Sequence, residues 1–170
     1  DEAPEEFADS FQLKGEVVKV LGWKDKNGLN AMVISLEDQK AKGDKKTKLM
    51  RAIHAYQEGD ASWTAMREFK ERVANCPFDI ILEPVTGEWS LSDADEDGIA
   101  EVTIAYHAGC TSDVSPNTHK VLMSEGGDKY ALRGSTRLDM GGKKMGGEYK
   151  VDPSFKSGPA SFLDHAKKAW

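Results

Sequence analysis

The sequence predicts an α+β fold: an antiparallel β-sheet with one or two helices packed on it. Three observations favour this class. Short segments of alternating or β-branched apolar residues recur, glycine-containing turns separate them, and one central stretch has apolar residues at helical spacing. The 170 residues are 39% hydrophobic and 31% charged, which suits one ordinary core. We therefore expect a disordered acidic N-terminus at 1–10 and a single α+β domain at 11–170.

The first half of the chain predicts three strands. Residues 11–23 are β-branched and partly alternating, and residues 29–37 carry apolar side chains at every second position. The Asn27-Gly28 dipeptide between them tolerates positive φ angles, so these two strands should form a hairpin. A lysine-rich stretch, which we interpret as a solvated loop, leads to a third strand at 47–57.

An amphipathic helix of about three turns is predicted after the third strand. Asp60 or Ser62 can cap its N-terminus, and Pro77 lies just beyond its end, as expected for a helix stop. Charged residues separate the apolar positions, which we expect to pack in the core. These positions are Trp63, Met66, Phe69 and Val73.

The second half predicts further strands and a short C-terminal helix. The helix, at 159–169, should direct Phe162, Leu163 and Ala166 inward. The glycine-rich segment 141–147 lacks the strand, helix and terminal Lys-Ser/Thr of a phosphate-binding loop. The expected strands are 78–83, 99–107, and a hairpin of 118–124 and 129–135 around Gly126-Gly127.

The most specific motif is the acidic run at 93–101, Asp-Ala-Asp-Glu-Asp-Gly-Ile-Ala-Glu. Alternating carboxylates converge only if the chain curls around a centre, and Gly98 permits that curl. Carboxylates held so close repel one another unless a cation lies between them, and calcium prefers six to eight oxygen ligands. The predicted calcium ligands are the carboxylates of Asp93, Asp95, Asp97 and Glu101 and the backbone carbonyl of Ile99. The alternative is a solvated acidic turn without an ion.

This run matches only the first half of an EF-hand loop. Ile104 stands at the twelfth position, where an EF-hand requires a bidentate glutamate, and the flanking segments read as strands. The run instead resembles the Asp-x-Asp-x-Asp-Gly-x-x-Asp/Glu calcium loops of integrin-type (FG-GAP) β-propeller repeats, whose ninth residue, here Glu101, closes the site. A propeller needs several copies, so the resemblance implies the loop alone.

A wider resemblance covers roughly residues 60–135. Its most similar segments are 92–106, Gly109-Cys110, 113–116 and 129–134. Over these segments the chain resembles a family of exported bacterial proteins, mostly of Bacteroidetes type, loosely labelled as surface polysaccharide biosynthesis proteins. The resemblance implies a location at the cell envelope and no particular reaction.

Export is also indicated by the N-terminus and the cysteines. The chain begins with Asp1 and an acidic stretch, as a secreted protein does after signal-peptide cleavage, and as a shortened chain does too. If strands 78–83 and 99–107 are neighbours, Cys76 and Cys110 can meet in a disulfide. The alternative is a pair of buried free thiols. We expect a periplasmic or cell-surface location, because disulfides persist in oxidising compartments.

Several classes of function are disfavoured. A net charge of −6 argues against nucleic acid as a partner, and no apolar run approaches the ~18 residues of a membrane span. A zinc site built from His107, Cys110 and His119 lacks tightly spaced ligand pairs. Neither a nucleophile elbow nor a dinucleotide-binding fingerprint is present.

Two hypotheses about function remain. The first is an exported, non-enzymatic binding or accessory module that is stabilised by structural calcium and binds a cell-surface glycan or an envelope protein. The second is an enzyme or binding protein that acts on surface polysaccharide, with calcium near a carbohydrate site. The residues that could stack on sugar rings are Trp23, Trp63, Trp89 and Trp170.

Overall fold

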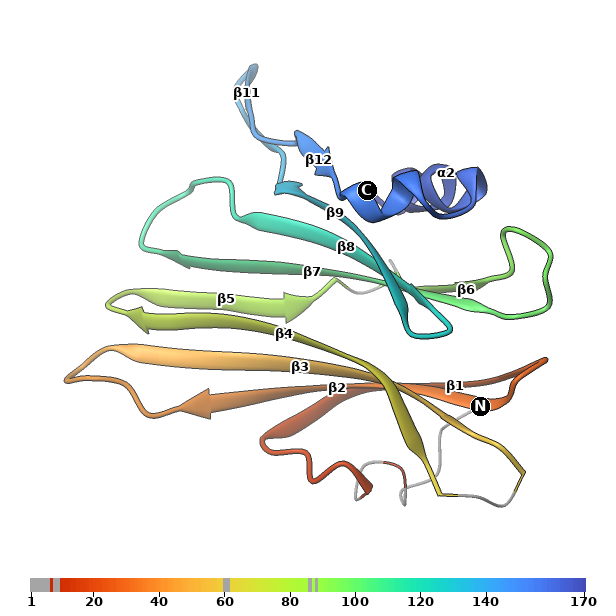
Figure 1. The fold of residues 1–170 in the computed structure, drawn as a ribbon. Helices are drawn as coiled ribbons and strands as arrows, with labels where there is room; N and C mark the ends of the chain where they lie inside the picture. Colours follow the sequence, from red (N-terminus) through yellow and green to blue (C-terminus); the bar gives the residue numbers. More distant parts are fainter. Residues whose placement is uncertain (1–6, 8–9, 60–61, 86, 88) are drawn as a thin grey trace.

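Two antiparallel β-sheets packed face to face form the centre of the molecule (Figure 1). This computed structural model describes residues 7, 10–59, 62–85, 87 and 89–170. The first sheet has the strand order β1-β2-β3-β4. Its strands are β1 (Glu16–Asp25), β2 (Gly28–Gln39), β3 (Lys46–Gln57) and β4 (Thr64–Cys76).

The second sheet has the strand order β12-β9-β8-β7-β5, and β6 also pairs with β7. Its strands are β5 (Asp79–Pro84), β6 (Ser90–Ser92), β7 (Glu101–Thr111), β8 (Thr118–Glu125), β9 (Asp128–Ser135) and β12 (Tyr149–Val151). Between β9 and β12, the strands β10 (Leu138–Met140) and β11 (Lys143–Met145) form a separate two-stranded arm. A 3-10 turn, η1 (Pro153–Lys156), and the helix α2 (Ala160–Lys168) come after β12.

The main core lies between the two sheets, because strands place alternate side chains on one face. Completely burying one such aliphatic side chain contributes about 1.5–3 kcal/mol. The first sheet contributes Met32, Ile34, Met50, Ala52 and Phe69, and the second contributes Leu82, Val102, Ile104, Tyr106, Ala108, Leu122 and Ala131.

Each outer sheet face carries a smaller cluster. The helix α2 covers the second sheet (Figure 1), where Phe162 and Ala166 are buried in one cluster with Leu132. The C-terminal helix predicted at 159–169 is therefore present. On the first sheet, Phe7 and Trp63 pack in a cluster with residues of β2 and β3. The predicted domain limits stay predictions, because residues 1–6 and 8–9 lie outside the described part of the chain.

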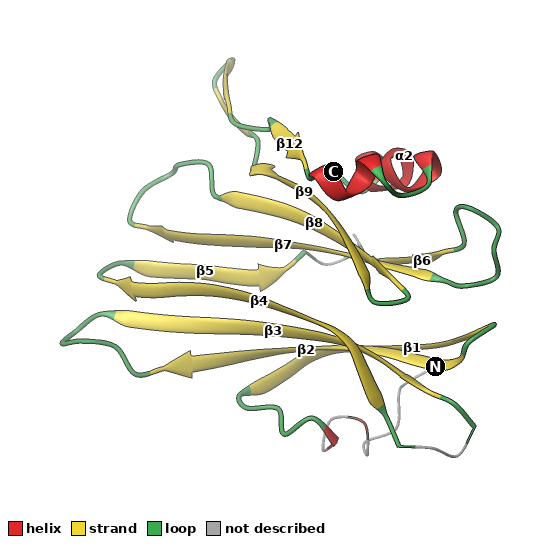
Figure 2. Cartoon of the chain, viewed as in Figure 1, coloured by secondary structure: helices red, strands yellow, loops and turns green. Residues whose placement is uncertain are grey.

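The predicted α+β class is wrong, because the described chain is essentially all-β (Figure 2). The segment predicted as an amphipathic helix is the strand β4, which pairs along its length with β3. Phe69 and Val73 are four residues apart, a spacing that shares one face in a helix and in a strand. Glu71, midway between Phe69 and Val73 in sequence, distinguishes a helix from a strand at this position. In the strand β4 it faces the second sheet, where its carboxylate accepts a hydrogen bond from the Tyr106 hydroxyl at 2.7 Å. Asp60, one of the predicted caps, is outside the described residues.

The predicted strands are present with shifted ends, and the first two form the predicted hairpin. Its turn is Lys26-Asn27 and not Asn27-Gly28, because Asp25 pairs with Gly28, and of the predicted turn residues only Gly28 has a positive φ, 115°. β1 begins at Glu16 instead of residue 11, and β7 extends beyond residue 107 to Thr111. The glycine-rich segment 141–147 contains β11, part of the two-stranded arm. No helix in the described residues has both the length and the apolar composition to cross a membrane.

The predicted disulfide between Cys76 and Cys110 is confirmed, with 5.6 Å between the two Cα atoms. Cys76 ends β4 of the first sheet and not a helix, while Cys110 lies in β7 of the second sheet. β5 and β7 are neighbours as expected, with Ile80 opposite Cys110. The disulfide therefore joins the two sheets at one end of β7.

Candidate metal centre

The acidic run at 93–101 forms a tight loop that connects β6 to β7. These two strands pair with each other, with Ser92 opposite Glu101, so the chain must reverse between them. Glu96 and Gly98 adopt positive φ angles of 62° and 86°. Glycine takes such angles without strain, which agrees with the predicted role of Gly98 in curling the chain.

The loop and the β8–β9 turn bring together two groups of carboxylates. In the first, ligand atoms of Asp93, Asp95 and Glu101 lie within 4.8 Å of one another. In the second, Asp95 and Asp97 lie within the same distance of Glu125, the last residue of β8. Because Asp95 belongs to both groups, the carboxylates form one continuous cluster that can hold a metal ion.

Backbone hydrogen bonds fix the orientation of two of these carboxylates. The Gly98 N–H donates to Asp93 Oδ2 at 3.1 Å, and the Ile99 N–H donates to Asp97 Oδ1 at 2.7 Å. Each bond leaves the second oxygen of its carboxylate for another interaction. The role of the Ile99 carbonyl as a ligand stays a prediction.

Glu101 is completely buried at the base of the loop, with 0% of its surface exposed. Its carboxylate accepts from the Ser92 hydroxyl at 2.6 Å and from the Ala94 N–H at 3.1 and 3.2 Å. Burial raises the pKa of Glu101 above its ordinary value, these hydrogen bonds oppose that rise, and the negative charge of Asp95 adds to it. A nearby cation would stabilise the ionised form.

Glu125 was missed by the sequence reasoning, because 24 positions separate it from Glu101 and it ends an ordinary hairpin strand. Burial, followed by the negative charges of Asp95, Asp97 and Glu101, raises the pKa of Glu125 to about 7. Oε1 of Glu125 and Oδ1 of Asp95 are buried oxygens without a hydrogen-bond partner among the described residues. An unsatisfied buried acceptor costs about 1–3 kcal/mol, and more when it is charged.

The loop also contacts the β1–β2 turn of the first sheet, which lies at the same end of the molecule (Figure 1). The Ala100 N–H donates to Asp25 Oδ2 at 3.1 Å, and the Lys26 N–H donates to the Gly98 carbonyl at 3.0 Å. Asp25 was also missed by the sequence reasoning, because an aspartate beside Asn27-Gly28 reads only as a turn residue. The carboxylate cluster is thus attached to both sheets.

The zinc combination is excluded by the disulfide, because Cys110 has no free thiol. His107 and His119 lie opposite each other on β7 and β8, with 4.9 Å between their ring centroids. The His119 ring also packs edge-on against Trp170.

The four tryptophans have different surroundings. Trp23 lies against His54, Trp63 against Phe7 and Trp170 against Tyr149, so each of these three packs on an aromatic neighbour. Trp89 lines an open pocket.

No family model, curated protein or solved structure matches this chain. The resemblances to propeller-type calcium loops and to the exported polysaccharide-associated family therefore stay predictions. Any assignment of function to this chain depends on the local geometry of its carboxylates.

Proposed function

We propose that this protein is an exported calcium-binding module in which the ion has a structural role. The observation that supports the proposal best is the continuous carboxylate cluster around Asp95, which adds Glu125 at the end of β8 to the acidic loop. The cluster draws acids from two separate segments, and two of its buried oxygens have no described hydrogen-bond partner. A bound cation would reduce the repulsion among the carboxylates of both groups.

The donor set favours calcium over the common alternatives. All ligand atoms in the two groups are carboxylate oxygens, whereas structural zinc prefers thiolate and imidazole ligands. Calcium accepts six to eight oxygens in flexible geometry, while magnesium demands near-octahedral geometry and usually keeps several waters. The proposed ligands are Asp93, Asp95, Asp97, Glu101, Glu125 and the Ile99 carbonyl.

The position of the loop supports a structural role for the ion. Its backbone contacts the β1–β2 turn of the first sheet, and Glu101 begins β7 of the second sheet. An ion here would hold both sheets and the β8–β9 turn in one arrangement. The expected partner is a cell-surface glycan or an envelope protein, and the Cys76–Cys110 disulfide supports an oxidising, periplasmic or cell-surface location.

A binding role suits the described pockets better than catalysis on polysaccharide. Glycoside hydrolysis needs a pair of carboxylates beside the sugar. The pocket beside Trp89 is lined by apolar side chains and one lysine. The acids of the cluster are engaged with one another and with the backbone of their loop.

Thermal unfolding in calcium and in chelator tests the proposal, with titration calorimetry as a direct measure of binding. Calcium at a hundredfold excess over its dissociation constant should stabilise the protein by about 2.7 kcal/mol. Asp95→Asn should abolish most of this gain, because Asp95 belongs to both carboxylate groups. Glu96→Gln is the matched control, since it removes one charge from the same loop outside either group. Equal midpoints in calcium and chelator, with no heat of binding, would refute the proposal.

A further inference from the structure

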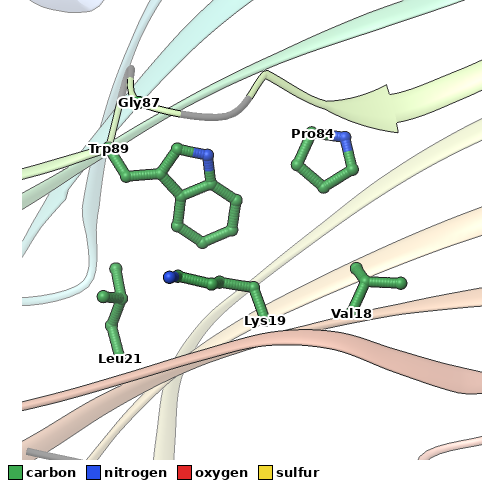
Figure 3. A pocket seen from close by; sticks show the side chains of 6 residues that line it. All are labelled: Val18, Lys19, Leu21, Pro84, Gly87 and Trp89. Atoms are coloured by element: carbon green, nitrogen blue, oxygen red, sulfur yellow. The ribbon is translucent and has the colours of Figure 1, made fainter.

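A pocket separate from the carboxylate cluster lies between β1 and the end of β5 (Figure 3). Its volume is about 320 Å³, which is within the range of small-molecule sites. Apolar side chains from both sheets line it, together with one lysine. The lining residues are Val18, Lys19, Leu21, Pro84, Gly87 and Trp89.

A β-bulge in β1 shapes this pocket. Val17 pairs with Ser35 and Lys19 pairs with Ile34, so Val18 is an extra residue without a partner in β2. In a regular strand, consecutive side chains point to opposite faces. The bulge allows both Val18 and Lys19 to line the same pocket, and bulges commonly re-aim side chains in this way.

The lysine is electrostatically unusual for an acidic protein. Lys19 Nζ lies 5.7 Å from the centroid of the Trp89 ring, and Figure 3 shows its side chain extending across the pocket. Within the described residues no carboxylate forms an ion pair with Lys19, although the chain carries a net charge of −6. The ammonium group is therefore available to an anion that enters the pocket.

Trp89 also lines a second cavity of about 220 Å³. The side chains of His165 and Lys168, from α2, line this second cavity with Ser90. His165 Nε2 lies 3.0 Å from the Ser90 hydroxyl. Each of the two cavities that Trp89 lines therefore has a lysine in its lining, Lys19 in the first and Lys168 in the second.

We propose that the Trp89 pocket binds a small carboxylate with an apolar body, which goes beyond the proposed calcium function and does not depend on it. The apolar body, a ring or a short chain, packs against Val18, Leu21 and Pro84 beside the Trp89 indole. The carboxylate pairs with the Lys19 ammonium in a charge-assisted hydrogen bond. A neutral sugar fits less well, because among the described lining side chains only Lys19 and the indole N–H can bond to hydroxyl groups.

The bulge and the lysine also have a purely structural explanation. β1 is an edge strand of the first sheet, and edge strands use lysines and bulges to prevent pairing with another chain. This explanation predicts that replacing Lys19 promotes aggregation and that the pocket binds nothing.

Titration calorimetry and amide NMR of the disulfide-bonded protein, in buffer without added calcium, test the proposal. The probes are decanoate, whose apolar body is a chain, and 2-naphthoate, whose apolar body is a ring. The control ligand is 2-naphthamide, which has the same ring as 2-naphthoate but no charge. We expect one carboxylate to bind with resonance shifts at the Trp89 indole and in β1, and the amide to bind at least about tenfold more weakly. Lys19→Gln should weaken carboxylate binding by a similar factor. Lys24→Gln, which removes the same charge from the same strand outside the pocket, should have no effect.

Two results would overturn the proposal. One is the absence of saturable binding of both carboxylates at millimolar concentration, with Lys19→Gln affecting only aggregation. The other is equal carboxylate affinity in wild type and Lys19→Gln. Because Lys19 is exposed on an edge strand, this variant should fold, and its NMR spectrum verifies that directly.

Discussion

The carboxylate of Asp25 accepts a hydrogen bond from the backbone N–H of Ala100, with 3.1 Å between Asp25 Oδ2 and the nitrogen. Asp25 ends β1 of the first sheet, and Ala100 immediately precedes β7 of the second. The same carboxylate accepts from the Asn27 N–H at 2.8 Å and from the Trp23 indole N–H at 3.3 Å. One side chain therefore fixes the β1–β2 turn and the acidic loop together.

Asp25→Ala should lower the free energy of unfolding by about 1–3 kcal/mol, because it leaves the partly buried Ala100 and Trp23 donors without their acceptor. Urea denaturation in chelator measures this loss without any contribution from a bound ion. Asp38→Ala is the control, since the Asp38 side chain is 86% exposed and its ion pair with Lys48 spans 3.7 Å. Equal effects of the two substitutions would show that the contact between loop and turn contributes no stability.

Glu125→Gln should have opposite effects with and without calcium. In chelator it removes one of several mutually repelling charges, so the free energy of unfolding should rise. In calcium it removes a proposed ligand, and the affinity should fall by about tenfold, or about 1.4 kcal/mol. Paired unfolding curves of wild type and variant measure both effects. A variant whose stability changes equally in both conditions would exclude Glu125 as a ligand.

Removal of the disulfide by Cys76→Ala with Cys110→Ala should destabilise the protein by about 3–4 kcal/mol. The bond links residues separated by 34 positions, and the chain-entropy estimate rises with the size of the loop that is closed. Denaturation of the double variant and of wild type, both in calcium, measures the difference. Thiol titration of wild type in denaturant without reductant should find no reactive cysteine, and two reactive thiols would contradict the crosslink.

His54 should make stability dependent on pH in the acidic range. The side chain is buried, Nδ1 lies 3.0 Å from the Ser124 hydroxyl, and Nε2 has no hydrogen-bond partner among the described residues. Burial lowers the pKa of His54 from 6.5 to about 4, although the charge of Asp25 partly opposes this. Between these two pH values the unfolded state binds more protons, so stability falls as the pH falls.

The loss attributable to His54 is about 3 kcal/mol between pH 7 and pH 4. Carboxylates titrate in the same range, so the test compares wild type with His54→Gln by urea denaturation at several pH values. The stability advantage of wild type over the variant should shrink as the pH falls. Parallel pH profiles of the two proteins would show that His54 does not remain neutral in the folded state.

The strand β4 shows where sequence reasoning about the fold reaches its limit. Apolar residues four positions apart satisfy both the helical and the strand period, so Phe69 and Val73 could not decide between them. Glu71 carries the deciding information, but its inward position makes sense only with its partners Tyr106 and Lys120, which are distant in sequence. Charged residues in one sequence give no indication of such long-range pairs.

The acidic loop was predictable because its carboxylates are close in sequence and their spacing is specific. The two other acids at the site, Asp25 and Glu125, were not predictable. They reach the loop only through the packing of the two sheets and through the pairing of β7 with β8. The disulfide was predictable from the count of two cysteines together with the expected proximity of two strands. Only the structure could show that Glu125, distant in sequence, joins the carboxylates of the loop.

Glu101 and Cys110 lie near opposite ends of the same strand, β7. One end is attached to the first sheet through the acidic loop, which is the proposed calcium site, and the other through a disulfide, which responds to redox potential. Where thiols stay reduced, as in a cytosol, the disulfide does not persist, and under the proposed function a scarcity of free calcium would also leave the loop without its ion. Under the proposed function, an oxidising, calcium-rich medium would supply both the crosslink and the ion, so the resistance of the chain to proteases should be higher there than in a reducing, calcium-poor medium.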